Sequence, residues 1–273
     1  MTELESWRGR RILAVDLDNT VLDSSKRLSE PTRLALARAN RAGFLVVPVS
    51  GRVFAFLKTF HASCELDGPV IGYNGASCMS PASGRVLFEE PVDPKLAERL
   101  LEFARARGAH VNFYADDLVY FDRPGPMADY YVKTFHVPFE QVADLAALGK
   151  PSVKVMLIAE ADRVSALAEE LKKVFAGEVD VSLSEPMHIE VLRAGVNKGR
   201  AIARLAGMIG AKAAQAIAIG DGENDVPMLR WAGRAVTVAG AHPKAIEAAE
   251  VVLGPADEDS VADFILTLIP RDS

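Results

Sequence analysis

Two aspartates that follow a short apolar segment are the residues of this chain best suited to chemistry. Asp16 and Asp18 come directly after Arg11–Val15, which reads as a buried strand. Side chains two residues apart in an extended segment point to the same side. Two neighbouring carboxylates repel each other unless a cation or a shared proton intervenes. Such a pair suits a magnesium site at which one carboxylate acts as a nucleophile and the other transfers protons.

Three further segments carry residues of compatible chemistry. They are Ser50–Arg52, Lys198 and Gly220–Asp225. The first and the third follow predicted strands, and ligands of open parallel sheets bind beyond the carboxyl ends of the strands. We therefore expect these segments to meet Asp16 and Asp18 at one edge of a sheet.

The acidic residues predict the ligands of one magnesium ion. Mg²⁺ prefers an octahedron of oxygen ligands and retains water, so two or three acids suffice. The carboxylates of Asp16 and Asp221 would bind the ion directly, and Asp18 would add its backbone carbonyl. We expect Asp225 to hold Lys198, or a water on the metal, rather than to ligate the ion itself.

The remaining polar groups are suited to binding a phosphoryl group. The ammonium of Lys198 and the hydroxyl of Ser50 would spread its negative charge, together with nearby backbone N–H groups. Asn224 would add a hydrogen bond, and Gly51 allows the close backbone approach that a phosphate requires. For Arg52, substrate binding and bracing of the protein both stay open.

The four segments contain neither histidine nor cysteine, which limits the choice of nucleophile. Asp16 is therefore the expected nucleophile, and the reaction would pass through an aspartyl-phosphate. We expect the carboxylate neighbour to raise the pKa of Asp18, so that Asp18 protonates the leaving oxygen and later activates water.

The elements that carry these segments alternate between strands and helices. Apolar runs at 12–15, 44–49 and 69–73 predict strands, and the stretches 29–42 and from 54 onward predict the helices between them. This βαβαβ order implies parallel strands with right-handed crossovers.

Between about residues 85 and 192 the pattern changes. Close strand pairs, such as 110–114 with 118–121, and two helices at 94–107 and 161–175 indicate an α+β module. The strand–helix alternation resumes near Asn197. We therefore predict one parallel-sheet domain at 1–82 and 194–273, interrupted by an inserted module at 83–193.

Composition limits the class of protein. Of 273 residues, 37 are acidic and 31 are lysine or arginine, which gives a net charge of −6 and argues against general affinity for nucleic acid or anionic membranes. Two cysteines without a CxxC pair argue against a disulfide scaffold, and no apolar run is long enough to span a bilayer. We expect a cytoplasmic protein.

Together these motifs resemble those of the haloacid dehalogenase superfamily. The residues that carry the resemblance are Asp16–Leu22, Ser50–Arg52, Lys198–Gly199 and Gly220–Asp225. Tyr73–Ala76 and Ile189–Leu192 are similar to the Cof-type branch, which has a class IIB cap. Asn19 and Ser50 replace the commoner Gly and Thr, and Val236–Gly240 replaces a stretch that usually ends in Gly-Asn-Ala.

The resemblance implies an α/β fold, with a Rossmann-like parallel core and an inserted α+β cap of the C2 type. It also implies magnesium, an aspartyl-phosphate mechanism and sugar phosphates or other small phosphorylated metabolites as substrates. Two alternatives stay open: a phosphomutase with the same chemistry, and a non-catalytic sensor of phosphorylated metabolites. The sequence indicates neither which metabolite is the substrate nor the oligomeric state.

Overall fold

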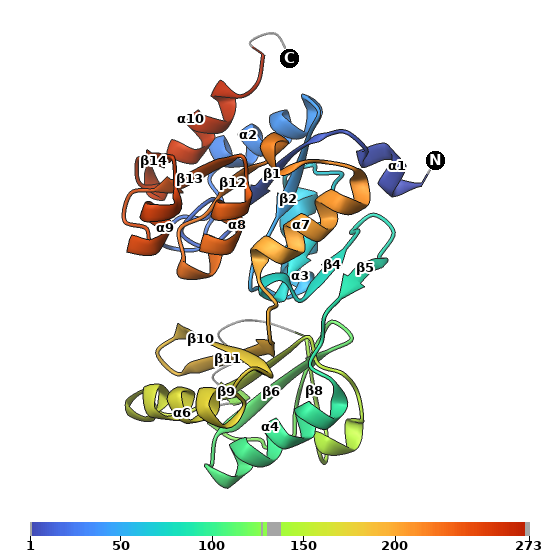
Figure 1. The fold of residues 1–273 in the computed structure, drawn as a ribbon, viewed down its shortest axis with the longest axis vertical. Coiled ribbons are helices and arrows are strands. Elements are labelled where there is room, and N and C mark those ends of the chain that lie inside the picture. Colours follow the sequence, from blue (N-terminus) through green and yellow to red (C-terminus); the bar gives the residue numbers. More distant parts are fainter. Residues whose placement is uncertain (1, 127, 130–137, 271–273) are drawn as a thin grey trace. The chain divides into compact units, whose positions relative to one another are not determined.

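The computed structural model describes residues 2–126, 128–129 and 138–270 (Figure 1). The chain forms two compact units, a core unit of Met1–Phe88 with Asn197–Ser273 and a cap unit of Glu89–Val196. The predicted domain boundaries, at 82 and 193, lie six residues before 88 and three before 196, and the assignment of a domain role to each unit stays a prediction. Within the described ranges, no helix is both long and apolar enough to cross a bilayer.

The core unit is built on a five-stranded parallel sheet with the order β14-β13-β12-β1-β2. The strands are β1 (Arg11–Val15), β2 (Phe44–Pro48), β12 (Ile217–Ile219), β13 (Arg234–Val238) and β14 (Val251–Leu253). All of β2, and β1 from Ile12 onward, is buried, as expected for parallel strands that are covered on both faces. The predicted parallel α/β core is therefore confirmed.

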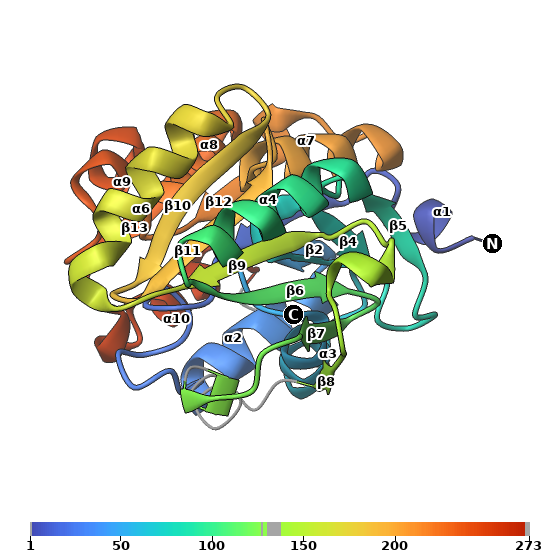
Figure 2. The same ribbon diagram turned by 90° about the horizontal axis from the view of Figure 1, so that it is seen from below.

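Helices cover both faces of this sheet. They are α1 (Glu3–Trp7), α2 (Glu30–Arg41), α3 (Phe54–Ser63), α7 (Lys198–Ile209), α8 (Val226–Trp231), α9 (Pro243–Ala248) and α10 (Ser260–Thr267). Helices α7 and α8 lie on one side of the sheet, and α2 and α10 lie on the other (Figures 1 and 2). The start of α2 follows the sequence closely, because Ser29 caps the helix by accepting a hydrogen bond from the backbone N–H of Thr32 at 3.2 Å.

The third predicted strand is shorter than expected and belongs to a different sheet. Strand β3 (Val70–Gly72) pairs antiparallel with β4 (Ser77–Met79), and β5 (Val86–Glu89) completes a three-stranded sheet. Its link to the parallel sheet is an isolated parallel bridge between Val49 and Ile71. The strand ends at Gly72 because the following residues turn into left-handed backbone conformations.

The cap unit contains a six-stranded mixed sheet with the order β10-β11-β9-β6-β7-β8. The strands are β6 (His110–Ala115), β7 (Leu118–Phe121), β8 (Phe139–Gln141), β9 (Lys154–Ile158), β10 (Val179–Glu185) and β11 (His188–Arg193). Helices α4 (Pro94–Ala106) and α6 (Ala161–Val174) lie across one face of this sheet (Figure 2). Their apolar sides and the strands enclose one hydrophobic core. The predicted α+β insertion is confirmed.

Candidate active site

Two neighbouring strands of the core unit bring Asp16 and Asp221 together. The end of β1 pairs with the end of β12, at Val15 and Ile219, so the residues that follow both strands emerge at the same edge of the sheet. The backbone N–H of Asp16 continues the pairing by donating to the carbonyl of Ile219 at 2.9 Å. Carboxylate oxygens of Asp16, Asp221 and Asp225 lie within 4.8 Å of one another.

Lys198 enters this cluster from the first turn of α7. The helix begins there because the side chain of Asn197 accepts a hydrogen bond from the backbone N–H of Arg200 at 2.9 Å. The Lys198 ammonium donates to Asp16 Oδ1 at 2.5 Å and to Asp225 Oδ1 at 2.6 Å. Its side chain is 1 % exposed, so these charge-assisted hydrogen bonds are shielded from water.

Asp225 connects Lys198 to the loop that carries Asp221. Its second oxygen, Oδ2, accepts hydrogen bonds from the backbone N–H groups of Asp221 and Gly222 at 3.0 and 2.8 Å. A Cβ at Gly220 would lie 2.5 Å from the carboxyl carbon of Asp225, so glycine is required there for the loop to fold over this carboxylate. The partners of Asp225 are those of a residue that holds Lys198 and the Asp221 loop in place.

The charges of the cluster perturb one another strongly. Burial and the carboxylate of Asp225 raise the pKa of Asp16 to about 7, although Lys198 opposes the shift. Burial and the charge of Asp16 raise the pKa of Asp221 to about 6. Burial disfavours the charged form of Lys198, but Asp16 and Asp225 outweigh it and raise the pKa of this lysine. The site therefore holds more negative charge than one lysine neutralises.

Asp18 lies in a different environment from the one expected. Arg52 donates to both of its carboxylate oxygens, at 2.6 and 2.9 Å, and Lys26 lies 3.5 Å away. Burial raises the pKa of Asp18, but the hydrogen bonds and charges of Arg52 and Lys26 outweigh it, so the pKa lies below its usual range. The expected rise in the pKa of Asp18 is therefore wrong, because sequence reasoning considered the neighbouring carboxylate and missed the two cations.

Ser50, Gly51 and Asn224 are tied to the loops of the core unit. The backbone N–H of Arg52 donates to the hydroxyl of Ser50 at 3.3 Å, and Ser50 is 1 % exposed. The side-chain amide of Asn224 donates to Asn74 Oδ1 at 3.0 Å. The side chain of Asn74 also packs on Gly51, where an added Cβ would lie 3.0 Å from its oxygen. Gly51 and Asn224 thus both contact the side chain of Asn74.

Two of the residues that complete the site were quoted in motifs but given no role. Thr20 donates from its hydroxyl to Asp221 Oδ1 at 3.1 Å, and Asn74 binds Asn224. Lys26, which contacts Asp18, lies in the loop before α2, and nothing in the local sequence pattern distinguishes it from a surface lysine.

The acids fit a hard divalent cation. Asp16 and Asp221 offer carboxylate oxygens, the donor type that Mg²⁺ prefers, in a cluster whose acids have raised pKa values. A cation there would offset the repulsion that raises those values. Asp225 belongs to the same cluster, but its oxygens already accept bonds from Lys198 and from two backbone N–H groups.

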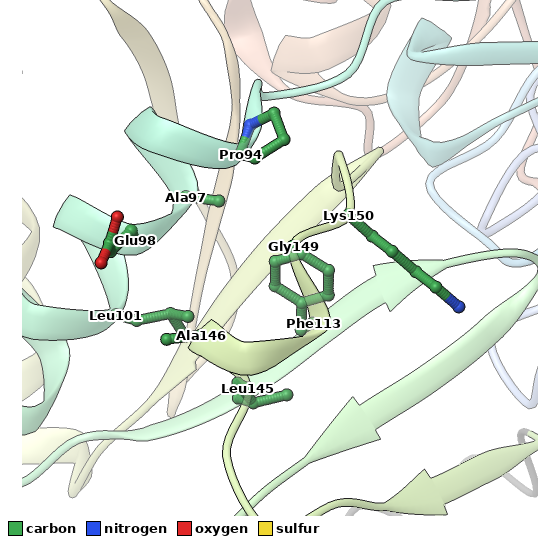
Figure 3. Close-up of a pocket in the computed structure, with 9 residues that line it drawn as sticks. All are labelled: Pro94, Ala97, Glu98, Leu101, Phe113, Leu145, Ala146, Gly149 and Lys150. Carbon is green, nitrogen blue, oxygen red and sulfur yellow. The ribbon is translucent and has the colours of Figure 1, made fainter.

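A separate hollow lies in the cap unit, between α4 and the loop that precedes β9. It is lined by Pro94, Ala97, Glu98, Leu101, Phe113, Leu145, Ala146, Gly149 and Lys150 (Figure 3). Its volume of about 10 Å³ is no more than one water molecule requires. None of the predicted site residues lines it.

Comparison with known sequences identifies the family. A sequence profile of haloacid dehalogenase-like hydrolases matches residues 13–265. The chain belongs to this family. The superfamily and the hydrolase class predicted from the motifs are therefore confirmed.

Named relatives of similar length are phosphatases, the enzyme class that the motifs predict. A pyridoxal phosphate phosphatase of Escherichia coli is 28% identical over 267 residues, which cover 93% of this chain and 97% of the relative. A 5-amino-6-(5-phospho-D-ribitylamino)uracil phosphatase of Bacillus subtilis is 28% identical over 264 residues, covering 93% of this chain and 96% of the relative.

Solved structures support the fold. A haloacid dehalogenase-like hydrolase from Bacteroides thetaiotaomicron superposes with a TM-score of 0.87 at 24% identity, and the match covers 95% of this chain and 100% of that one. The likeness therefore extends over both the core and the cap units, each of which has its counterpart in that chain.

Proposed function

We propose that this protein is a magnesium-dependent phosphatase that hydrolyses phosphomonoesters of small metabolites through an aspartyl-phosphate on Asp16. The observation that carries the proposal is the buried cluster in which Lys198 binds Asp16 and Asp225 beside Asp221. A nucleophilic carboxylate, a cation for the phosphoryl oxygens and oxygen ligands for a metal are thereby brought together. The phosphatases among the relatives support the same activity.

In this proposal, the carboxylates of Asp16 and Asp221 and the backbone carbonyl of Asp18 hold one Mg²⁺ ion. Its charge would stabilise the phosphoryl oxygens as the reaction proceeds. The hydrogen bond from Thr20 to Asp221 orients the second ligand.

Asp16 then forms a bond to phosphorus as the ester P–O bond breaks. Lys198 fixes the direction of the Asp16 carboxylate and is placed to bind a phosphoryl oxygen. Ser50 and Asn224 provide further hydrogen bonds to the phosphoryl group. Asp18 gives a proton to the leaving oxygen, and afterwards takes one from the water that attacks phosphorus and frees Asp16.

The role of Asp18 requires a change in its contacts. Arg52 holds both of its oxygens and stabilises the ionised form, which cannot donate a proton. In this proposal, Arg52 releases Asp18 when a substrate phosphoryl group offers the guanidinium a competing anion. The same guanidinium is stacked on Phe56, with its central carbon 3.9 Å from the ring centre, so its release from Asp18 also requires a shift over this ring.

The substrate class expected is a small phosphorylated metabolite, such as a sugar phosphate or a phosphorylated heterocycle. Two of the relatives, a pyridoxal phosphate phosphatase and a 5-amino-6-(5-phospho-D-ribitylamino)uracil phosphatase, support this class. The cytoplasmic location expected from composition stays a prediction.

A screen of phosphorylated metabolites for phosphate release, with and without Mg²⁺, tests this function. We expect release that depends on Mg²⁺ and that Asp16→Asn abolishes while the variant stays folded. An isomerised sugar phosphate without free phosphate would indicate a phosphomutase. Ligand binding that requires Mg²⁺ without any turnover would indicate a sensor.

A further inference from the structure

The turn after β3 has an unusual backbone. Three residues in succession adopt positive φ angles: Tyr73 at 52°, Asn74 at 54° and Gly75 at 104°. Glycine does so freely, asparagine does so occasionally, and a bulky aromatic residue is a clear exception. Tyr73 and Asn74 are nevertheless buried, so the surrounding structure maintains this conformation at a cost in free energy.

The backbone of the turn contacts two of the segments that form the active site. The backbone N–H of Asn74 donates to the carbonyl of Ser50 at 3.0 Å, and that of Tyr73 donates to the carbonyl of Arg52 at 3.3 Å. A Cβ at Gly75 would lie 2.5 Å from the carbonyl oxygen of Asn197, the cap of α7. The turn therefore packs between the Ser50 loop and the start of the helix that carries the catalytic lysine.

The side chain of Asn74 reaches a third segment. Its Oδ1 accepts a hydrogen bond from Asn224 Nδ2 at 3.0 Å, while Asn224 Oδ1 packs so close to Gly222 that a Cβ there would lie 2.4 Å away. The amide nitrogen of Asn224 is thus held by Asn74, and its oxygen lies against Gly222. An amide nitrogen has two hydrogens, and the bond to Asn74 uses one of them.

We propose that Asn74 is a positioning residue that directs the second amide hydrogen of Asn224 toward the substrate phosphoryl group. Asparagine suits the position because it tolerates the left-handed backbone and its side chain supplies the acceptor. This inference rests on the proposed phosphatase function, since Asn74 acts through Asn224 and does not itself touch the substrate.

The variant Asn74→Gly separates the side chain from the backbone. Glycine keeps the left-handed turn without strain and removes only the amide, so we expect a melting temperature close to that of the wild-type protein. We expect kcat/KM for p-nitrophenyl phosphate to fall about tenfold, mainly through a raised KM, because the Asn224 amide is no longer directed at the phosphoryl group. Calorimetry with inorganic phosphate and Mg²⁺ should show binding weakened by a similar factor.

A double-mutant cycle tests whether Asn74 acts through Asn224. Asn224→Ala alone and together with Asn74→Gly should bind phosphate equally weakly, because the second change removes the partner of a group that is already absent. The matched control is Asp117→Gly, which removes a side chain from another positive-φ position, in the β6–β7 hairpin of the cap unit, and should leave kcat/KM unchanged.

The outcomes distinguish this inference from the proposed function. If the wild-type protein hydrolyses phosphate esters and Asn74→Gly has the same KM and the same phosphate affinity, the positioning role alone is overturned. Losses that multiply in the double variant would also overturn it. A wild-type protein that binds phosphate without hydrolysing any ester would refute the phosphatase, while weakened phosphate binding in Asn74→Gly would still support the positioning role. A wild-type protein that neither hydrolyses an ester nor binds phosphate would overturn both.

Discussion

Two lysines are buried among the described residues, and they differ in the number of carboxylates that surround them. In the core unit, Lys198 binds both Asp16 and Asp225, and Asp221 lies in the same cluster. In the cap unit, Lys154 pairs with Glu190 at 3.0 Å and lies over the ring of Tyr114.

The two groups differ in their net charge. Three carboxylates around Lys198 leave a local excess of negative charge, which raises the pKa values of Asp16 and Asp221. The Lys154–Glu190 pair matches an ammonium with a carboxylate. Excess like charge is costly, and perturbed pKa values of this kind are typical of functional sites, so the comparison supports the proposal that the Lys198 cluster is the reactive one.

The largest effect is expected from Asp16→Asn. The amide cannot attack phosphorus, so kcat should fall on the order of 10⁴-fold or more. Because the change also removes one charge from a repulsive cluster, the melting temperature should not fall. Steady-state hydrolysis of p-nitrophenyl phosphate and thermal unfolding measure the two quantities. Activity near that of the wild type would refute Asp16 as the nucleophile.

Replacement of each buried lysine by methionine sharpens the comparison. Lys198→Met should lower kcat about 10²- to 10³-fold, because a preorganised cation at the phosphoryl group is lost. Both changes leave buried carboxylates without their cation and should destabilise the fold, by about 3–5 kcal/mol for Lys154→Met, but only Lys198→Met should also lower kcat. Activity assays and urea unfolding test the two expectations.

The paired variant provides the control. Lys154→Met together with Glu190→Met removes both charges, and its free energy of unfolding should return close to that of the wild type. If the double variant stays as unstable as the single one, then the two buried lysines do not differ as described.

Magnesium should stabilise the protein more at high pH than at low pH. The raised pKa values of Asp16 and Asp221, about 7 and 6 against 3.8, favour folding while these acids are protonated. That contribution is fully present below about pH 4 and is lost as the pH rises through 6 to 7. Since Mg²⁺ binds the ionised acids, its effect on the melting temperature should be small near pH 5 and large near pH 8. An equal effect at both, or one retained in Asp221→Asn, would contradict the site.

The smallest effect is expected from Arg52→Lys. Lysine keeps the charge but loses the two parallel hydrogen bonds to Asp18 and most of the stacking on Phe56. We expect kcat/KM to fall less than about tenfold, with a melting temperature within a few degrees of the wild type. A loss as large as that of Lys198→Met would place Arg52 in the reaction itself.

The sequence predicted the elements of the fold where local signals were strong. Ser29 and Asp93 mark helix starts by capping, and apolar runs mark β1 and β2. The meeting of Asp16 with Asp221 followed from the rule that ligands lie at the carboxyl ends of parallel strands.

Other features depend on tertiary structure that no local pattern encodes. Nothing in the type of residue indicates that Tyr73 adopts a positive φ angle and ends β3 early, because its burial among other elements imposes that conformation. The pairing of Arg52 with Asp18 was missed for a related reason, since a long side chain has many rotamers and the selected one depends on neighbours such as Phe56.

The most direct test of the account is to trap the phosphorylated enzyme. The wild-type protein is mixed with substrate and Mg²⁺, quenched rapidly in acid, digested, and its peptides are analysed by mass spectrometry. We predict one phosphoryl group on Asp16, absent without Mg²⁺ and, once formed, longer-lived in Asp18→Asn, which lacks the base for the second step. If the wild-type protein releases phosphate but neither it nor Asp18→Asn carries a phosphoryl group on Asp16, the aspartyl-phosphate mechanism is contradicted.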